Sequence, residues 1–381
     1  MPNEMIAVGG GKGGVGKSLF SLALAMAYAE RGQEVVLVDL DLGAGNLHTY
    51  LGIAPTQPSI AEFLERKAAS LDELRLHTSV PQLSLISGAG FLPGMANPPH
   101  WLKLKLIRHL QQLPCAVVIL DLGAGVSFNT LDFFLAAQHG VVVSVPEAPA
   151  IMNAYSFLKA VAFRQLHRVF KQHQEVAPLL ASHATADNAA AANHTTLEML
   201  FADILRCGPD AAQLGEEVLQ SLQAGLVMNR LAPGNQHELL HNLLKLAQHK
   251  LGLPLTHLGN MPEVREMGHY LLKVPSLTGT PSGRAWVDAA AHIADSLVPP
   301  RPAIPLDALK RSYSDTEVAA VIELIEQLDD SIFPDGKRDS WKLRMYFKPE
   351  TVLHHLLDHG LPPQQLNSVL EQPLPLSHVA A

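Results

Sequence analysis

The sequence contains only two cysteines, Cys115 and Cys207, in 381 residues. They lie far apart in the chain and form no CxxC pair, so one chain offers neither a disulfide framework nor a cysteine-ligated metal or cluster motif. Charged residues are also sparse, at 17% against 48% hydrophobic residues. This balance excludes a chain dominated by disorder and favours a large buried core.

Long apolar runs and a basic net charge are lacking as well. No stretch of about 18 uninterrupted apolar residues is present, and the opening residues MPNEMIAVGGGKGG show no basic segment leading into an apolar one. The 28 Lys and Arg residues stand against 36 Asp and Glu residues, a formal net charge of −8. We therefore expect a cytoplasmic protein whose overall field does not draw it to nucleic acid or anionic lipid.

Short apolar runs recur along the chain and predict strands. They cover residues 5–8, 34–38, 83–86, 116–120, 141–145, 226–228 and 255–258. Most of them are separated by segments with helical spacing. This alternation predicts an α/β fold, with a doubly wound, mostly parallel sheet covered by helices on both faces.

Composition divides the chain into a large domain and a C-terminal module. Residues 1–297 carry the alternating pattern, interrupted at about 150–224 by a stretch without strand signals that predicts a helical insertion. The segment 298–305, VPPRPAIP, is predicted to be a linker, because repeated prolines neither continue a helix nor pair in a central strand. Residues 306–381 then form a small, mainly helical module expected to bind a partner. Its first helix is expected at 314–330, behind a capping box.

A complete phosphate-loop motif lies near the start of the chain. Between a predicted strand and a predicted helix, the sequence G-x-x-x-x-G-K-[ST] is satisfied by Gly11, Lys12, Gly13, Gly14, Val15, Gly16, Lys17 and Ser18. The glycines let backbone N–H groups face phosphate oxygens, while Lys17 adds charge and Ser18 offers a hydroxyl to Mg²⁺. An ordinary glycine-rich turn would not require the flanking strand and helix.

Three aspartates follow predicted strands. Asp39 and Asp41 belong to VDLDLGAGN, and Asp121 begins DLGAG after VVIL. Two carboxylates at a strand end beside a phosphate loop can hold Mg²⁺ indirectly and orient an attacking water. The alternative is that these residues only cap loops.

These motifs resemble the MinD and ParA family of deviant-Walker ATPases over roughly residues 4–297. The additional lysine at the start of KGGVGKS, Lys12, is characteristic, because in that family it reaches across a nucleotide-sandwich dimer to the partner's ATP. The resemblance implies ATP or ADP with Mg²⁺ as ligands and catalytic roles for Lys12, Lys17 and Asp41, with Asp41 positioning the water. It also implies metal contacts for Ser18, Asp39 and Asp121.

Two later segments resemble the family's adenine-binding elements. In VMNR, Asn229 would hydrogen-bond the base beside Arg230, and in GNMPE the loop with Pro262 would pack on it. Either segment could instead be an ordinary junction between a strand and a loop, without a role in binding.

Residues 121–134 and 141–160 resemble the MinD-like branch that includes the flagellar-number regulator FlhG. The resemblance implies a homodimer on ATP binding and a monomer with ADP, which together regulate the placement or number of flagella or of a similar assembly. Protein partners would bind the C-terminal module or the dimer face, with recruitment to a cell pole or a membrane-associated assembly. A basic amphipathic membrane helix is not recognisable, because segment 314–330 is acidic.

Two other functions fit parts of the pattern. A metallocluster-maturation or carrier ATPase, related to the nitrogenase iron protein and the Mrp group, would need paired cysteines that Cys115 and Cys207 do not supply. A nucleotide-binding module without hydrolysis would not need the intact set of Lys17, Ser18 and Asp41.

Overall fold

The computed structural model describes residues 4–42, 45–54, 58–65, 67–88, 100–184, 197–222, 224–231 and 237–297. The chain divides into two units, Met1–Pro299 and Pro300–Ala381. All described residues belong to the first unit. The expected linker 298–305, the module 306–381 and its helix at 314–330 therefore lie outside the described residues.

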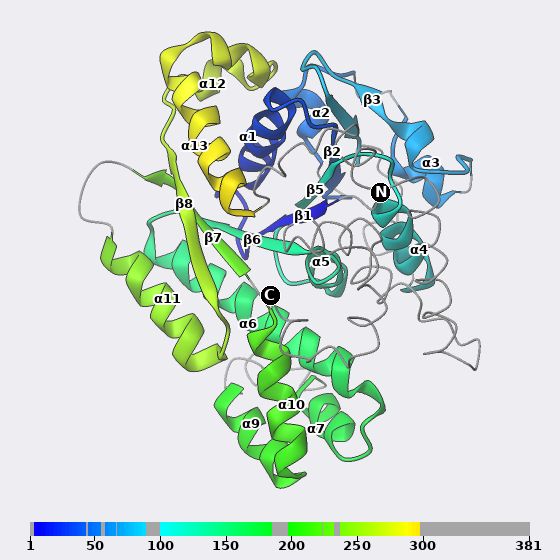
Figure 1. The fold of residues 1–381 in the computed structure, drawn as a ribbon, viewed down its shortest axis with the longest axis vertical. Helices are drawn as coiled ribbons and strands as arrows, with labels where there is room; N and C mark the ends of the chain where they lie inside the picture. The colour runs from blue at the N-terminus through cyan, green and yellow to red at the C-terminus, as the bar shows by residue number, and fades with distance from the viewer. Residues whose placement is uncertain are drawn as a thin grey trace, which may run out of the picture. The chain divides into compact units, whose positions relative to one another are not determined.

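A mixed sheet forms the centre of the first unit (Figure 1). Its eight strands follow the order β3-β4-β2-β5-β1-β6-β7-β8. Their bounds are β1 (Glu4–Gly9), β2 (Val35–Leu40), β3 (Leu76–His77), β4 (Leu83–Ile86), β5 (Val117–Leu122), β6 (His139–Ser144), β7 (Ala224–Leu231) and β8 (Leu255–Pro262). Every neighbouring pair is parallel except β3 with β4. The predicted doubly wound, mostly parallel sheet is confirmed.

Helices cover both faces of this sheet (Figure 1). Their bounds are α1 (Lys17–Glu30), α2 (Leu47–Tyr50), α3 (Ile60–Leu64), α4 (His100–Gln111), α5 (Phe128–Phe134), α6 (Ala148–Val169), α7 (Val176–Ala184), α9 (Leu197–Arg206), α10 (Pro209–Gln220), α11 (His237–Leu251), α12 (Met267–Tyr270) and α13 (Pro281–Leu297). Short 3₁₀ turns lie at Asp72–Leu74, Phe170–Gln172 and Val274–Gly279. In the described part of the chain, no helix is long and apolar enough to cross a membrane.

The sheet has a hydrophobic core on each of its two faces, which explains why the strand sequences are unbroken apolar runs. In β1, Met5 and Ala7 join the core under α4, α5, α6 and α11, while Ile6 and Val8 join the core under α1 and α13. Because β1, β2, β4, β5 and β6 are buried on both faces, alternation with polar residues is absent from them, whereas the edge strand β8 is only partly buried. All seven predicted apolar runs are strands in the structure. The added strand, β3, has two residues and is too short to leave a pattern.

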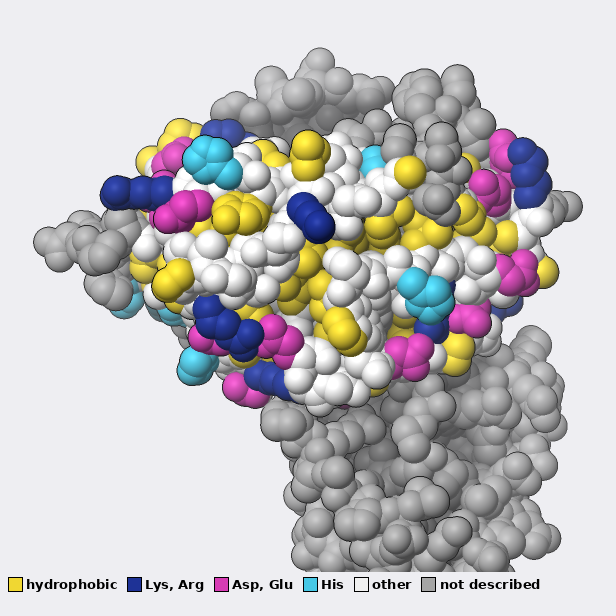
Figure 2. Space-filling view, turned by 90° about the horizontal axis from the view of Figure 1, so that it is seen from above, with side chains coloured by type: hydrophobic (Ala, Val, Ile, Leu, Met, Phe, Trp, Pro, Cys, Tyr) yellow, Lys and Arg dark blue, Asp and Glu magenta, His cyan; other side chains and the backbone are white. Residues whose placement is uncertain are grey.

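The side of α1 and α13 faces the viewer in Figure 2. Acidic and basic side chains are intermixed around the margin of this view, and apolar side chains form a band across its middle.

Ion pairs join α1 and α13, with 2.8 Å between Arg31 and Asp295 and 2.7 Å between Arg284 and Glu30. Such exposed pairs contribute about 0–1 kcal/mol each, so the apolar contact between the helices dominates.

The chain between β6 and β7 carries the helical segment expected at about 150–224. It contains α6, α7, α9 and α10, and no strand among its described residues. The long helix α6 packs on the sheet through Ala154, Phe157 and Leu158. The helices α9 and α10 pack beyond it, with Ile204 and Leu219 buried in the same core.

Residues 1–297 are expected to fold and to bind nucleotide without the rest of the chain. The repeated prolines after Leu297 mark a boundary across which few contacts are needed. Circular dichroism melting of the 1–297 fragment should show a single cooperative transition, and a fluorescent ADP analogue should bind it as it binds the full chain. A fragment that becomes soluble only when residues 298–381 are added back would place the boundary elsewhere.

Candidate functional site

The predicted phosphate loop connects the end of β1 to the start of α1. It turns sharply, because Gly14 and Gly16 have φ values of 79° and 91°, in the left-handed region that favours glycine. Gly11 is required for another reason, since a Cβ there would lie 2.0 Å from the carbonyl oxygen of Asn153 on α6. The loop is therefore shaped both by local backbone conformation and by contact with α6.

The two lysines of the loop lie in opposite environments. Lys17 is only 8% exposed, and its Nζ donates a hydrogen bond to the carbonyl oxygen of Lys12 at 3.3 Å. Burial lowers the pKa of Lys17, against the opposing charges of Asp121 and Asp41. The side chain of Lys12 is exposed. Lys17 is thus positioned to meet a ligand inside the loop, and Lys12 to meet a group outside the chain.

The carboxyl ends of β2 and β5 bring the predicted acids together. Asp39 and Asp121 are direct neighbours in the register of the two parallel strands. Asp41 lies against Gly123 of DLGAG, because a Cβ on that glycine would lie 3.2 Å from Asp41 Oδ1. Asp41 also acts electrostatically on Lys17 and Asp121. The structure therefore gathers all three aspartates beside the phosphate loop.

Asp39 holds the loop that follows β2. It is fully buried, its Oδ1 accepts a hydrogen bond from the N–H of Asp41, and its Oδ2 accepts one from the N–H of Leu47, each at 3.2 Å. Gly45 packs on the same carboxylate, since a Cβ there would lie 2.5 Å from Oδ2. Burial, together with the nearby charge of Asp121, raises the pKa of Asp39. These contacts hold the backbone after β2 in place. A metal ion bound by Asp39 would use the carboxylate lone pairs that these two hydrogen bonds leave free.

Asp121 is joined to α1 by two hydroxyl groups. It is 2% exposed, and its Oδ1 accepts a hydrogen bond from Ser21 Oγ at 3.0 Å. The hydroxyl of Ser18 donates to the same carboxylate. Burial raises the pKa of Asp121, and the two hydroxyl donors oppose that rise. The predicted metal residues Ser18 and Asp121 are therefore in direct contact.

The donor set at this edge suits Mg²⁺. It consists of the hydroxyl oxygen of Ser18 and the carboxylates of Asp41 and Asp121, all of them hard oxygen ligands. Among the described residues, no three His, Cys, Asp or Glu side chains form a group that could hold a metal ion by themselves, so a bound Mg²⁺ would also need oxygens from the nucleotide and from water.

The predicted adenine residues lie at the ends of β7 and β8. Asn229 is 8% exposed, its Nδ2 donates to the carbonyl oxygen of Val15 at 2.9 Å, and its Oδ1 accepts from the N–H of Arg230. Arg230 has a φ of 55° and an exposed side chain. Pro262 ends β8, opposite Leu231. Asn229 thus ties the end of β7 to the phosphate loop, which the sequence did not suggest.

Two residues at this site were not predicted from the sequence. Ser21 lies three positions after Ser18 on α1, and that spacing puts both hydroxyls on one helix face. The three-residue spacing of Ser18 and Ser21 is a signal for this site that the sequence carries. The sequence carries no comparable signal for Asn153, because its contact with Gly11 involves only its backbone and Cβ.

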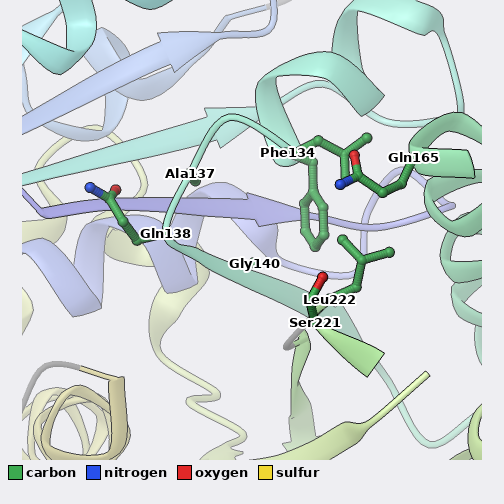
Figure 3. Close-up of a pocket in the computed structure, with 8 residues that line it drawn as sticks. Phe134, Ala137, Gln138, Gly140, Gln165, Ser221 and Leu222 are labelled. Carbon is green, nitrogen blue, oxygen red and sulfur yellow. The ribbon is translucent and has the colours of Figure 1, made fainter. Parts of the chain in front are cut away.

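A pocket of about 230 Å³ lies elsewhere (Figure 3). Its lining residues are Phe134, Leu135, Ala137, Gln138, Gly140, Gln165, Ser221 and Leu222. Gly140 is near the start of β6, and Ser221 and Leu222 precede β7. The pocket therefore lies at the amino edge of these strands, whereas the phosphate loop and the aspartates lie at the carboxyl edge.

Comparison with known proteins places this geometry among nucleotide-binding domains. The family model described as the CobQ/CobB/MinD/ParA nucleotide binding domain matches residues 6–270. The fold is similar to that of the septum site-determining protein MinD from Pyrococcus horikoshii, solved with Mg-ADP, with a TM-score of 0.51 at 17% identity over 81% of this chain and 98% of that chain. A ParA family ATPase from Chlorobium tepidum gives a TM-score of 0.51 at 17% identity over 77% of this chain and 98% of that chain.

Three curated relatives are similar to less than half of the chain. Antiactivator FleN of Pseudomonas aeruginosa is 31% identical over 42% of this chain and 56% of its own length. Flagellum site-determining protein YlxH of Helicobacter pylori is 32% identical over 41% of this chain and 53% of its length. Septum site-determining protein MinD of Thermotoga maritima is 29% identical over 40% of this chain and 55% of its length. The chain thus spans about half the length of the curated relatives it matches.

Proposed function

The chain belongs to the CobQ/CobB/MinD/ParA nucleotide-binding family, as a MinD/ParA-type P-loop ATPase near the FlhG and MinD branch, and on this basis we propose that it hydrolyses ATP with Mg²⁺. We further propose that it switches between an ATP-bound dimer and an ADP-bound monomer. The observation that carries this proposal is the convergence of Lys17, Ser18 and Asp121 at one edge of the sheet. Lys17 and Ser18 come from the start of α1 and Asp121 from the end of β5, and each supplies a group that a bound Mg²⁺–nucleotide requires.

Each of these residues has a distinct task in the proposed reaction. Backbone N–H groups of the loop and the start of α1 face the phosphates, and Lys17 places its charge on them. Ser18 and Asp121 would hold Mg²⁺, which when bound neutralises charge on the phosphate oxygens. Asp41 accepts a hydrogen bond from the attacking water and fixes its direction of approach. Its position over Gly123 places it next to the loop that follows Asp121.

The exposed position of Lys12 supports the proposed dimerisation. Its side chain is exposed although it belongs to the phosphate loop, so a second chain could receive it. Two chains that face each other across their nucleotides would exchange these lysines, and ATP would be bound by both. Loss of the γ-phosphate would remove part of the anionic surface that both lysines hold, and the dimer would dissociate.

The loop 121–125 is the proposed connection between nucleotide and surface. It begins with the last two residues of β5, Gly125 has a φ of 95°, and α5 begins three residues later at Phe128. Phe128 is 66% exposed and Val126 is 49% exposed. A change in this loop on hydrolysis would move these apolar side chains, and so would change the surface that partners meet.

The biological role we propose is the positioning of a cellular assembly, such as flagella. YlxH is named a flagellum site-determining protein, MinD a septum site-determining protein and FleN an antiactivator, and all three match this chain. Protein partners would bind the dimer face or residues 306–381, with recruitment from the cytoplasm to a cell pole or a membrane-associated assembly. The acidic net charge of −8 gives no support to binding of nucleic acid.

The cysteines give no support to a metallocluster carrier. Cys115 Sγ lies 3.6 Å from the carbonyl oxygen of Val117, and Cys207 Sγ lies 3.6 Å from that of Asp203. The first precedes β5 and the second lies between α9 and α10. Neither lies beside the phosphate loop, where a dimer would have to pair them.

The Asp41→Ala variant is expected to lose phosphate release by a factor of about 10² or more, because a positioned acceptor for the attacking water contributes about 10²–10⁴. Binding of a fluorescent ATP analogue should be retained, since Asp41 makes no contact that shapes the phosphate loop. Asp72→Ala, which removes an exposed carboxylate paired with Arg75, is the control. Wild-type chain that releases no phosphate from Mg-ATP would overturn the hydrolysis proposal, whereas equal rates would remove only Asp41 from it.

A further inference from the structure

Ser21 is a buried polar residue that the proposed reaction has not used. It is 0% exposed, and its Oγ donates to Oδ1 of Asp121, which is 100 residues away in the chain. A serine inside a helix often donates to the carbonyl oxygen four residues earlier instead. Here the hydroxyl leaves the helix and joins α1 to the end of β5.

The hydrogen bond from Ser21 restrains the carboxylate of Asp121, which otherwise receives a side-chain hydrogen bond from Ser18. The χ2 torsion of an aspartate is broad and roughly two-fold, so its carboxylate rotates easily unless it is held. A hydrogen bond to Oδ1 fixes that rotation and sets the direction in which Oδ2 points. Mg²⁺ demands near-ideal octahedral geometry and keeps several of its waters. The direction of the carboxylate therefore matters for any Mg²⁺-bound water that it receives.

Ser18 cannot do this alone. It lies in the first turn of α1, it is partly exposed, and its oxygen is the proposed metal ligand. Its position must therefore respond to the metal and the phosphates. Ser21 lies one turn deeper and is closed off from solvent, so its bond to Asp121 is present before any ligand arrives.

We propose that Ser21 is a positioning residue, which orients the Asp121 carboxylate for Mg²⁺ through its hydrogen bond to Oδ1. The inference rests on the proposed function and adds to it a residue that is not a metal ligand. Because Ser21 acts through Asp121, its loss should change the response to Mg²⁺ and leave the direct contacts of the phosphates unchanged.

The test measures binding of a fluorescent ADP analogue to the full chain, first in EDTA and then along a Mg²⁺ titration. Ser21→Ala should bind the analogue in EDTA like wild type, but should need about tenfold more Mg²⁺ for the half-maximal effect, because a hydrogen bond to a charged group is lost. Ser21→Thr keeps the hydroxyl and should restore the wild-type titration. Ser21→Cys keeps the volume with a weaker donor and should fall between the two.

Ser84→Ala is the matched control, because it removes another buried serine, on β4, away from the site. A Ser21→Ala titration that coincides with wild type would overturn the inference. If Ser21→Ala does not fold, the Cys variant decides in the same way, since its titration must shift if the donor matters. Wild-type chain that binds no analogue at any Mg²⁺ concentration would instead overturn the proposed function, so the two failures are distinguishable.

Discussion

Replacing Lys12 with alanine is expected to abolish ATP-dependent dimerisation and to leave nucleotide binding by the single chain in place. The Lys12 side chain is exposed, and its contribution to the loop is the carbonyl oxygen that Lys17 Nζ contacts. Alanine keeps that carbonyl. In a dimer that buries the phosphates, however, removal of the counter-charge leaves buried anionic groups uncompensated, which costs about 3–5 kcal/mol. The dimer dissociation constant should rise by a factor of about 10² or more.

Light scattering measures the molecular mass, in an Asp41→Ala background in which hydrolysis is expected to be blocked. The mass should double with Mg-ATP when Lys12 is present and stay that of one chain when it is replaced. Lys67→Ala is the control, because Lys67 is an exposed lysine that forms an ion pair with Glu65. Lys17→Ala should differ from Lys12→Ala by losing nucleotide binding as well. Doubling of mass without ATP in the Asp41→Ala chain would contradict the switch.

Removing Asp132 is expected to destabilise the folded chain by about 3–5 kcal/mol, the usual cost of breaking a buried ion pair. Asp132 lies on α5 between α4 and α6 and is buried, as is Lys103, whose ammonium group contacts it. Arg164 of α6 binds the same carboxylate with two hydrogen bonds of 2.7 Å. Without the carboxylate, two desolvated cations would face each other across α5.

Urea unfolding of Asp132→Ala and Asp132→Asn measures this effect, because the midpoint should fall while the slope stays the same. Asp203→Ala is the control, since it breaks an ion pair in which Arg206 is 79% exposed; such a pair is worth about 0–1 kcal/mol. A loss at Asp132 no larger than the loss at Asp203 would show that the three charges do not act as a buried unit.

The contribution of Asp132 should also depend on pH in a defined direction. Burial alone would raise the pKa of Asp132, but hydrogen bonds from Arg164 and Lys103 outweigh it and hold that pKa below its ordinary value. A carboxylate with a lowered pKa stabilises the folded state above its unfolded pKa, near 3.9, and this stabilisation is lost as pH falls through the folded value. The difference between wild type and Asp132→Asn should therefore be constant from about pH 5 to 8 and shrink below about pH 4.

The sequence alone determined the sheet, the phosphate loop and the acids that surround it. Strands buried on both faces are unbroken apolar runs, and glycines with a terminal lysine and serine make a motif of fixed spacing. The positions of Asp39, Asp41 and Asp121 could be predicted because each lies at or just after the end of a strand, and the carboxyl ends of parallel strands share one edge. In all of these, the information lies within a few neighbouring residues.

Only the tertiary structure decided which side chains hold the site in shape. Asn229 reaches the carbonyl oxygen of Val15 across 214 positions of the chain, and Ser21 reaches Asp121 across 100. The structure also shows that both oxygens of Asp39 accept hydrogen bonds from backbone N–H groups, while its metal contact stays a prediction. Contacts of this kind depend on how helix, strand and loop pack against one another. This packing depends on the whole core, so a short sequence pattern cannot predict it.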